Sequence, residues 1–141
     1  MQRAQDIPYL PIRFFKSHTI QSFKGKPVKT FTSSGTTTSI NAQHHLADLS
    51  NYRASFQACF EQFYGKPKDW AILALLPSYL EREGSSLIYM MDSLIAQSKN
   101  EHSGFYLDDL AKLNALLLEL EQQKQPTLLF GVSFALLDFT E

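Results

Sequence analysis

Hydrophobic and polar positions divide the first half of the chain into an extended segment, a strand, a loop and a helix. Two prolines in residues 7–14 disfavour a helix, so we expect this segment to be extended and to lie across the core. A strand is predicted over residues 28–31, followed by a loop over residues 32–39. Between residues 41 and 64, apolar side chains recur every three or four positions, which predicts a helix with one broad buried face. The apolar side chains expected to hold the opening segment on the core are Ile7, Leu10, Ile12 and Phe14.

The second half alternates between short apolar runs and helical patterns. Residues 70–76 are continuously apolar and stop at Pro77, which is typical of a strand buried on both faces. One helix is predicted to begin at Gly84 and Ser85, and another at Asp108 and Asp109, whose carboxylates suit the positive end of a helix. The remaining predicted elements are a short strand over residues 105–107, a buried strand over residues 127–132 and a final helix over residues 134–139 capped by Ser133.

This alternation of strands and helices predicts an α/β fold with a mostly parallel sheet and crossover helices. We expect one partial domain over residues 1–141, with residues 1–27 as an extended N-terminal segment that packs on it. The last helix begins close to the end of the sequence, so the chain is expected to be the N-terminal piece of a longer domain.

Composition and charge narrow the class of protein. The 141 residues are 44% hydrophobic and 19% charged, which is enough apolar material for a packed core. A formal net charge of -1 provides no basic field to hold a nucleic-acid backbone. No apolar run approaches the ~20 residues that cross a bilayer, and the first residues lack the pattern of a signal peptide. The single cysteine, Cys59, cannot form an internal disulfide, so we expect a reducing, cytoplasmic location.

The loop over residues 32–39 is the most distinctive feature, because seven of its eight side chains carry a hydroxyl group. A loop between a strand and a helix can turn its backbone N–H groups toward an anion, and hydroxyl groups add further donors. Gly35 would allow a positive φ and close approach of the backbone to a ligand. The sequence is neither a Walker A motif nor a dinucleotide fingerprint. The residues alone therefore leave open both a phosphate-binding loop and an ordinary Ser/Thr-rich turn.

Three stretches of the sequence resemble one family of ligases. They are PYLPI with FKS in residues 8–17, FTSSGTT in residues 31–37 and LFGVSFALL in residues 129–137. The second resembles the phosphate loop of adenylate-forming, acyl-activating enzymes, and the first and third resemble their acyl-protein synthetase (LuxE-type) branch. The sequence departs from that pattern at Thr38, where the family usually has a second glycine, and no lysine lies nearby.

The resemblance implies the incomplete N-terminal portion of an adenylate-forming enzyme's large domain. The complete enzyme would use ATP and Mg²⁺ to convert a fatty or other carboxylic acid to an acyl-AMP. It would then transfer the acyl group to a thiol of a protein cysteine or of CoA. The family's later motifs for adenine, magnesium and ribose do not occur here, so we expect the chain alone to be inactive and assign no catalytic residue. The cofactor-binding residues that the resemblance implies are Thr32, Ser33, Ser34, Gly35, Thr36, Thr37 and Thr38.

An alternative of another class is a non-catalytic α/β module that binds a partner protein and no nucleotide. In either case the C-terminal region is expected to expose apolar side chains, including Leu129, Phe134 and Leu137, and to form a symmetric dimer. Cys59 is interpreted as a buried, inert thiol on the apolar face of its helix. His44 and His45 would point about 100° apart on a helix and could not share a metal, so no metal site is assigned.

Overall fold

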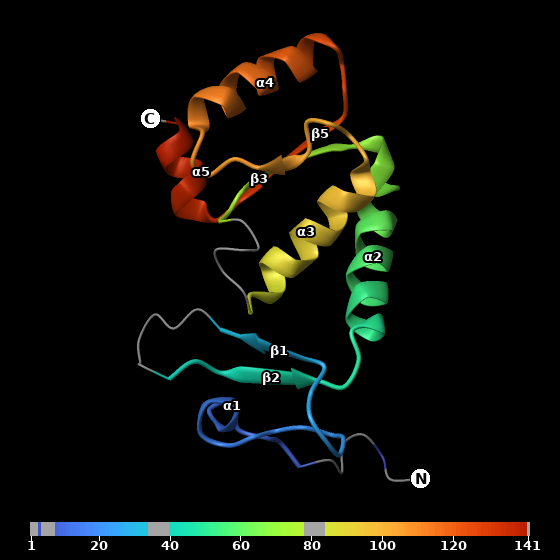
Figure 1. Cartoon of the computed structure of the whole chain (residues 1–141), viewed down its shortest axis with the longest axis vertical. Helices are drawn as coiled ribbons and strands as arrows, with labels where there is room; N and C mark the ends of the chain where they lie inside the picture. The colour runs from blue at the N-terminus through green and yellow to red at the C-terminus, as the bar shows by residue number, and fades with distance from the viewer. Residues whose placement is uncertain (1–2, 4–7, 34–39, 78–83, 141) are drawn as a thin grey trace. The chain divides into compact units, whose positions relative to one another are not determined.

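The computed structural model describes residues 3, 8–33, 40–77 and 84–140. The chain forms two compact units, Met1–Leu49 and Ser50–Glu141 (Figure 1), which are described separately. No helix in the described residues is long and apolar enough to span a bilayer.

The first unit contains the short helix α1 (Phe14–Ser17) and an antiparallel pair of strands, β1 (Lys29–Thr32) and β2 (Gln43–Leu46). The register runs from Lys29 opposite Leu46 to Thr32 opposite Gln43. The opening segment differs from the prediction, because a helical turn begins where the backbone N–H of Phe14 donates to the carbonyl of Pro11 at 2.9 Å. Leu10 is 48% exposed and Ile12 is 85% exposed, so neither side chain is buried in a core.

The helix predicted from residue 41 begins only at Ser50, and residues 43–46 form strand β2 instead. Pairing with β1 accounts for this difference. The backbone of β2 is hydrogen-bonded along β1, and the Thr30 hydroxyl lies 2.9 Å from His45 Nδ1. The apolar spacing that suggested one continuous helix therefore spans a strand, a short connection and a helix. Local periodicity did not reveal the partner strand, which lies about a dozen residues away in the sequence.

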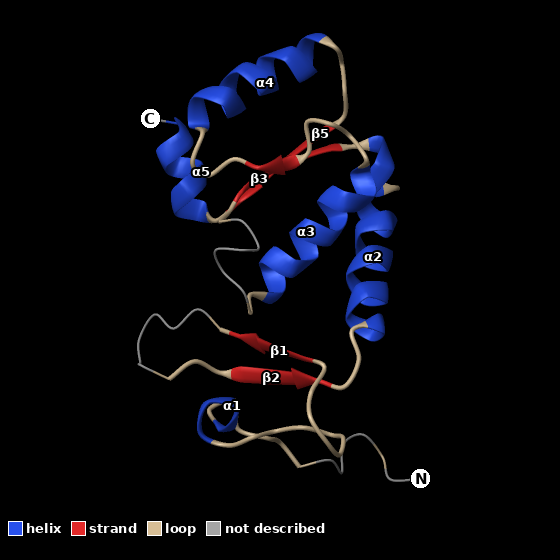
Figure 2. Ribbon diagram, in the orientation of Figure 1, coloured by secondary structure: helices blue, strands red, loops and turns tan. Residues whose placement is uncertain are grey.

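The second unit is built on a parallel three-stranded sheet in the order β4-β3-β5 (Figure 2). Its strands are β3 (Ala71–Leu75), β4 (Gly104–Phe105) and β5 (Thr127–Gly131). The helices are α2 (Ser50–Tyr64), α3 (Ser86–Ser98), α4 (Leu110–Gln122) and α5 (Ser133–Thr140), with a 3-10 turn, η2 (Pro67–Asp69), before β3. This arrangement confirms the α/β class. The predicted strand over residues 28–31 is not part of this sheet, because β1 pairs antiparallel with β2 in the other unit.

Helices cover both faces of the parallel sheet. Ile72 and Ala74 project from β3 into a core formed with α2 and α3, whereas Leu73 and Leu75 project into a second core formed with α4 and α5. All five residues of β3 are fully buried, which confirms the prediction of a strand buried on both faces. Burial of a leucine-sized side chain contributes ~1.5–3 kcal/mol, so β3 stabilises both layers.

β5 is less buried than its sequence predicts. It pairs with β3 from Ala71 opposite Thr127 to Leu75 opposite Gly131, and all five of its residues are partly exposed. Within the described residues no strand pairs with its other edge. An apolar strand is fully buried only when both of its neighbours are present, and β5 is an edge strand here.

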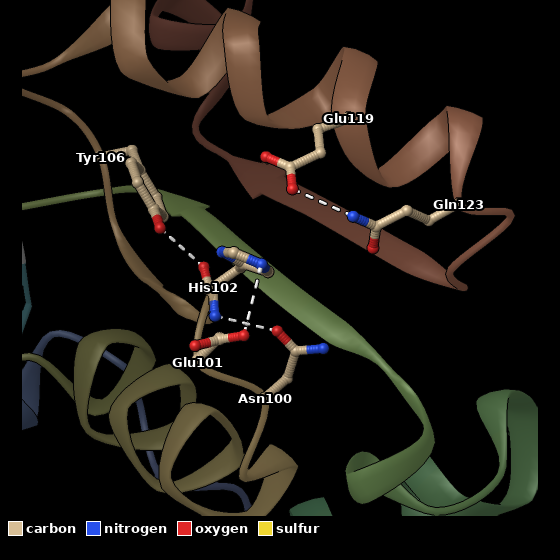
Figure 3. Close-up of polar contacts among 6 residues, drawn as sticks. All are labelled: Asn100, Glu101, His102, Tyr106, Glu119 and Gln123. Carbon is tan, nitrogen blue, oxygen red and sulfur yellow. Dashed lines mark hydrogen bonds and ion pairs between the residues drawn. The ribbon is translucent and has the colours of Figure 1, made fainter.

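Polar groups define the ends of the helices and the connection before β4. Helix α3 begins directly after Ser85, close to the predicted start, and the Ser85 side chain caps it by accepting from the backbone N–H of Ile88 at 3.4 Å. The connection between α3 and β4 is held by short hydrogen bonds (Figure 3). His102 N–H donates to Asn100 Oδ1 at 2.9 Å, and the Tyr106 hydroxyl donates to the His102 carbonyl at 2.6 Å. These contacts fix the loop that brings β4 alongside β3.

Gly131 at the end of β5 allows α5 to pack closely on the sheet. A Cβ atom at this position would lie 2.9 Å from Leu75 Cβ and 3.1 Å from Leu136 Cγ. Carbon atoms in favourable contact are about 3.5–4.0 Å apart, so the space is already filled by these two leucines. The absence of a side chain therefore lets α5 lie over the central strand.

Candidate functional site

The hydroxyl-rich segment begins at the end of strand β1. Thr32 is the last residue of that strand and is exposed, and Ser33 is exposed next to it. The backbone N–H of Ser33 donates to the carbonyl of Ala42 at 3.0 Å. The Ser33 hydroxyl in turn accepts from the backbone N–H of Ala42 at 3.0 Å. Ser33 thus joins the two sides of the connection from β1 to β2.

Of the seven residues expected to bind phosphate, the structure describes only Thr32 and Ser33. The expected exposure of the loop and the place of Gly35 near its tip lie outside the described residues. The same is true of the other loop residues, Ser34, Thr36, Thr37 and Thr38.

The expectation that this loop leads from a strand into a helix is wrong. Strand β2 follows the loop, and helix α2 begins only at Ser50. The positive end of a helix dipole acts over about one turn, so it cannot assist an anion at a loop that enters a strand. Any anion bound there would depend on the backbone N–H groups and hydroxyl groups of the loop itself.

The two adjacent histidines lie on strand β2 rather than on a helix. Successive side chains of a strand point to opposite faces, so His44 and His45 diverge more than the helical prediction implied. The rings of Phe15 and His44 are nearly perpendicular with 6.4 Å between centroids, and His45 is hydrogen-bonded to Thr30. Among the residues placed by the structure, no three His, Cys, Asp or Glu side chains gather in a metal-binding group.

Two tyrosines of the second unit have perturbed acidities. Partial burial raises the pKa of Tyr52, and its hydroxyl donates to the Ser86 carbonyl at 2.9 Å. Burial also raises the pKa of Tyr106. Both phenols stay protonated at neutral pH and act as hydrogen-bond donors: Tyr52 links α2 to α3, and Tyr106, the residue after β4, is joined to the loop before β4.

The second unit also contains an apolar pocket of about 220 Å³. It lies on the face of the sheet covered by α2 and α3 and reaches the edge strand β5. The residues lining it are Phe56, Cys59, Phe60, Phe63, Tyr64, Met90, Met91, Leu94, Leu128 and Phe130. Sequence reasoning did not identify this pocket. The signals were present as aromatic residues along α2, paired methionines on α3 and alternating apolar residues on β5.

Cys59 is exposed, which corrects the interpretation of a buried thiol. The broad apolar face predicted for this helix is narrower than expected, because only Phe56 and Phe60 of α2 are buried. Phe63, on the same face, is 70% exposed. β5 is an edge strand of the sheet in the described residues, and the part of the helix face that carries Cys59 and Phe63 remains exposed.

Comparisons with known proteins do not assign the chain to a family. No protein-family model matches the sequence, and neither curated proteins nor solved structures provide a match.

Proposed function

We propose that the chain is the N-terminal part of an ATP-dependent acyl-activating enzyme and that residues 32–38 bind the phosphates of ATP. The complete enzyme would convert a fatty or other carboxylic acid to an acyl-AMP with the aid of Mg²⁺. It would then pass the acyl group to the thiol of a protein cysteine or of CoA. The observation that carries this proposal is the FTSSGTT sequence beginning at the end of strand β1.

The described part of the loop supports phosphate binding in two ways. Thr32 and Ser33 are exposed at the end of the strand, where their hydroxyl groups can donate to a ligand from solvent. The paired hydrogen bonds between Ser33 and Ala42 fix the base of the loop, which lowers the entropy lost when it closes on an anion.

The chemical role of this loop would be electrostatic. Attack of the substrate carboxylate on the α-phosphorus forms the acyl-phosphate bond and breaks the bond to the bridging oxygen, so pyrophosphate leaves with the electron pair. Donors directed at the β- and γ-phosphates would stabilise the charge that develops on that leaving group. No side chain of the loop needs to form a covalent bond to substrate.

Binding of ATP and of pyrophosphate to the full 141-residue chain tests the proposal. Isothermal titration calorimetry should detect both ligands, and the triple variant S34A/T36A/T37A should bind each at least about tenfold more weakly, because hydrogen bonds to a charged group contribute about 1.5–3 kcal/mol. Ser55→Ala removes an exposed hydroxyl on α2 and serves as the matched control. Absence of binding, or equal binding by the triple variant, would contradict the proposed role of the loop.

The chain by itself should release no pyrophosphate from ATP in the presence of fatty or aryl acids. Adenylation needs the carboxylate, the α-phosphate and the metal held in line, and the family's segments for adenine and magnesium do not occur in these residues. A coupled pyrophosphate assay measures this directly. Acid-dependent release well above background would show that the groups needed for adenylation are encoded here.

A non-catalytic interaction module is the second candidate, favoured by the unpaired edge of β5 in the described sheet and by exposed Phe134 and Leu137 on α5. The two candidates differ in one measurement. The interaction module binds no nucleotide, whereas the ligase fragment does.

A further inference from the structure

We propose that the apolar pocket between α2, α3 and β5 binds an uncharged aromatic molecule of one ring or two fused rings. All residues that line the pocket belong to the Ser50–Glu141 unit, and none of them is part of the hydroxyl-rich loop sequence, so the proposal does not depend on ATP binding. Figure 1 shows helices α2 and α3 side by side at the sheet that carries β5.

The volume of the pocket sets the size of the ligand. At about 220 Å³, it is larger than an engineered protein cavity of about 150 Å³ that takes up benzene. It is smaller than the pockets of about 300–1,000 Å³ that hold drug-sized ligands. A single substituted ring or a fused bicyclic ring matches this size, whereas a nucleotide does not.

The side chains of the wall favour an aromatic ring over an aliphatic chain. Aromatic rings pair with one another through offset or edge contacts, and thioether sulfur atoms also make favourable contacts with rings. The wall supplies both kinds of partner. Its aromatic and sulfur-bearing residues are Phe56, Phe60, Phe63, Tyr64, Phe130, Cys59, Met90 and Met91.

The wall has no charged side chain, which disfavours ionised ligands. None of the ten lining residues is Asp, Glu, Lys, Arg or His. A carboxylate or an ammonium group moved from water into this pocket would lose its hydration without gaining a partner, which is costly. An aromatic acid would therefore bind much more weakly than the uncharged ring from which it derives.

The pocket has a closed floor and an open mouth. Met91 and Leu94 at the floor are 1% and 2% exposed, so the walls there are fixed by packing. Phe63 and Tyr64 at the mouth are 70% and 50% exposed, and Cys59 is also exposed. A ring entering from this side would remove the exposed apolar surface of Phe63 from water, which favours binding.

The test uses toluene and naphthalene as probes of the full chain, with benzoate as the charged counterpart. Saturation-transfer NMR should show that toluene and naphthalene both bind and that each displaces the other. Benzoate should bind at least about tenfold more weakly than toluene. Cys59 is the chain's only cysteine and lines the pocket, so bound toluene should slow its reaction with a water-soluble aromatic disulfide. Unchanged thiol reactivity at saturating toluene would place the binding elsewhere and overturn the proposal.

Variants on α2 separate the pocket from general surface binding. Cys59→Trp places a bulky ring at the mouth and should weaken toluene binding by about tenfold or more. Cys59→Ser keeps the size of the side chain, and Ala58→Trp adds the same ring at an exposed position that does not line the pocket, so both should bind toluene as the original chain does. Circular dichroism of each variant confirms that it is folded.

Two outcomes overturn the proposal. In the first, the hydrocarbons fail to bind, or they bind equally to Cys59→Trp and Ala58→Trp. In the second, light scattering shows a dimer that Cys59→Trp dissociates while toluene does not bind. The pocket would then be a contact between protein chains rather than a ligand site.

Discussion

Replacement of Gly131 by alanine should destabilise the Ser50–Glu141 unit by about 1–2 kcal/mol, because overpacking outweighs the backbone benefit of alanine. The added Cβ would lie 2.9 Å from Leu75 Cβ, roughly 0.6 Å or more inside the favourable separation of carbon atoms. Leu75 Cβ is attached directly to the backbone of β3, so rotation of that side chain cannot relieve the overlap. Either β3 and β5 must separate or α5 must move.

The magnitude follows from two opposing effects. Overpacking of a filled core costs about 1–3 kcal/mol. Alanine in place of glycine restricts the unfolded chain and recovers about 0.4–1 kcal/mol where the native backbone tolerates it. Gly131 has no positive φ, so this offset applies. For a unit of about 60–100 residues, each kcal/mol lowers the melting temperature by about 4–8 °C.

Thermal and urea unfolding followed by fluorescence of Trp70 measures the effect. Trp70 is the only tryptophan and lies in the same unit, next to β3. Gly104→Ala is the matched control, because a Cβ there would lie 3.6 Å from Tyr106, an ordinary contact. It should leave stability unchanged or raise it slightly. If Gly131→Ala unfolds at the same temperature and urea concentration as the original chain, the overlap is relieved without cost and the reasoning fails.

Three further predictions concern buried polar groups and exposed apolar ones. Ser103→Ala should destabilise the second unit by about 1–3 kcal/mol in urea unfolding, because the Ser103 hydroxyl accepts from the buried N–H of Ile72 at 2.9 Å; unchanged stability would contradict this. Burial raises the pKa of Tyr52 in the folded state, so its contribution to stability is present below pH ~10 and is lost as the pH rises through the folded pKa. Tyr52→Phe should therefore lose less stability at alkaline pH than the original chain does. Parallel curves of unfolding free energy against pH for the two proteins would argue against this cause. The chain should form a dimer through its C-terminal region, and Phe134→Ser with Leu137→Ser, at positions 67% and 64% exposed, should weaken it in light scattering during size-exclusion chromatography; a monomer at tens of micromolar would contradict dimer formation.

Several elements of the second unit could be predicted because their cause is local. The side chains of β3 are apolar on both faces of the strand, which favours burial on both faces, and the structure buries all five residues. Ser85 and Asp109 cap the helices that follow them, because short polar side chains satisfy free backbone N–H groups at any helix start. These features, and the alternation that indicates an α/β class, need no knowledge of distant residues.

Other features depend on contacts between distant segments, and only the tertiary structure decided them. The residues around His44 have apolar neighbours at helical spacing, yet they form a strand because β1 supplies backbone partners. Cys59 and Phe63 belong to an apolar helix face, yet both are exposed because β5 lies at the edge of the described sheet. A sequence pattern records which side chains favour burial, but the fraction actually buried depends on how far the neighbouring elements extend over them.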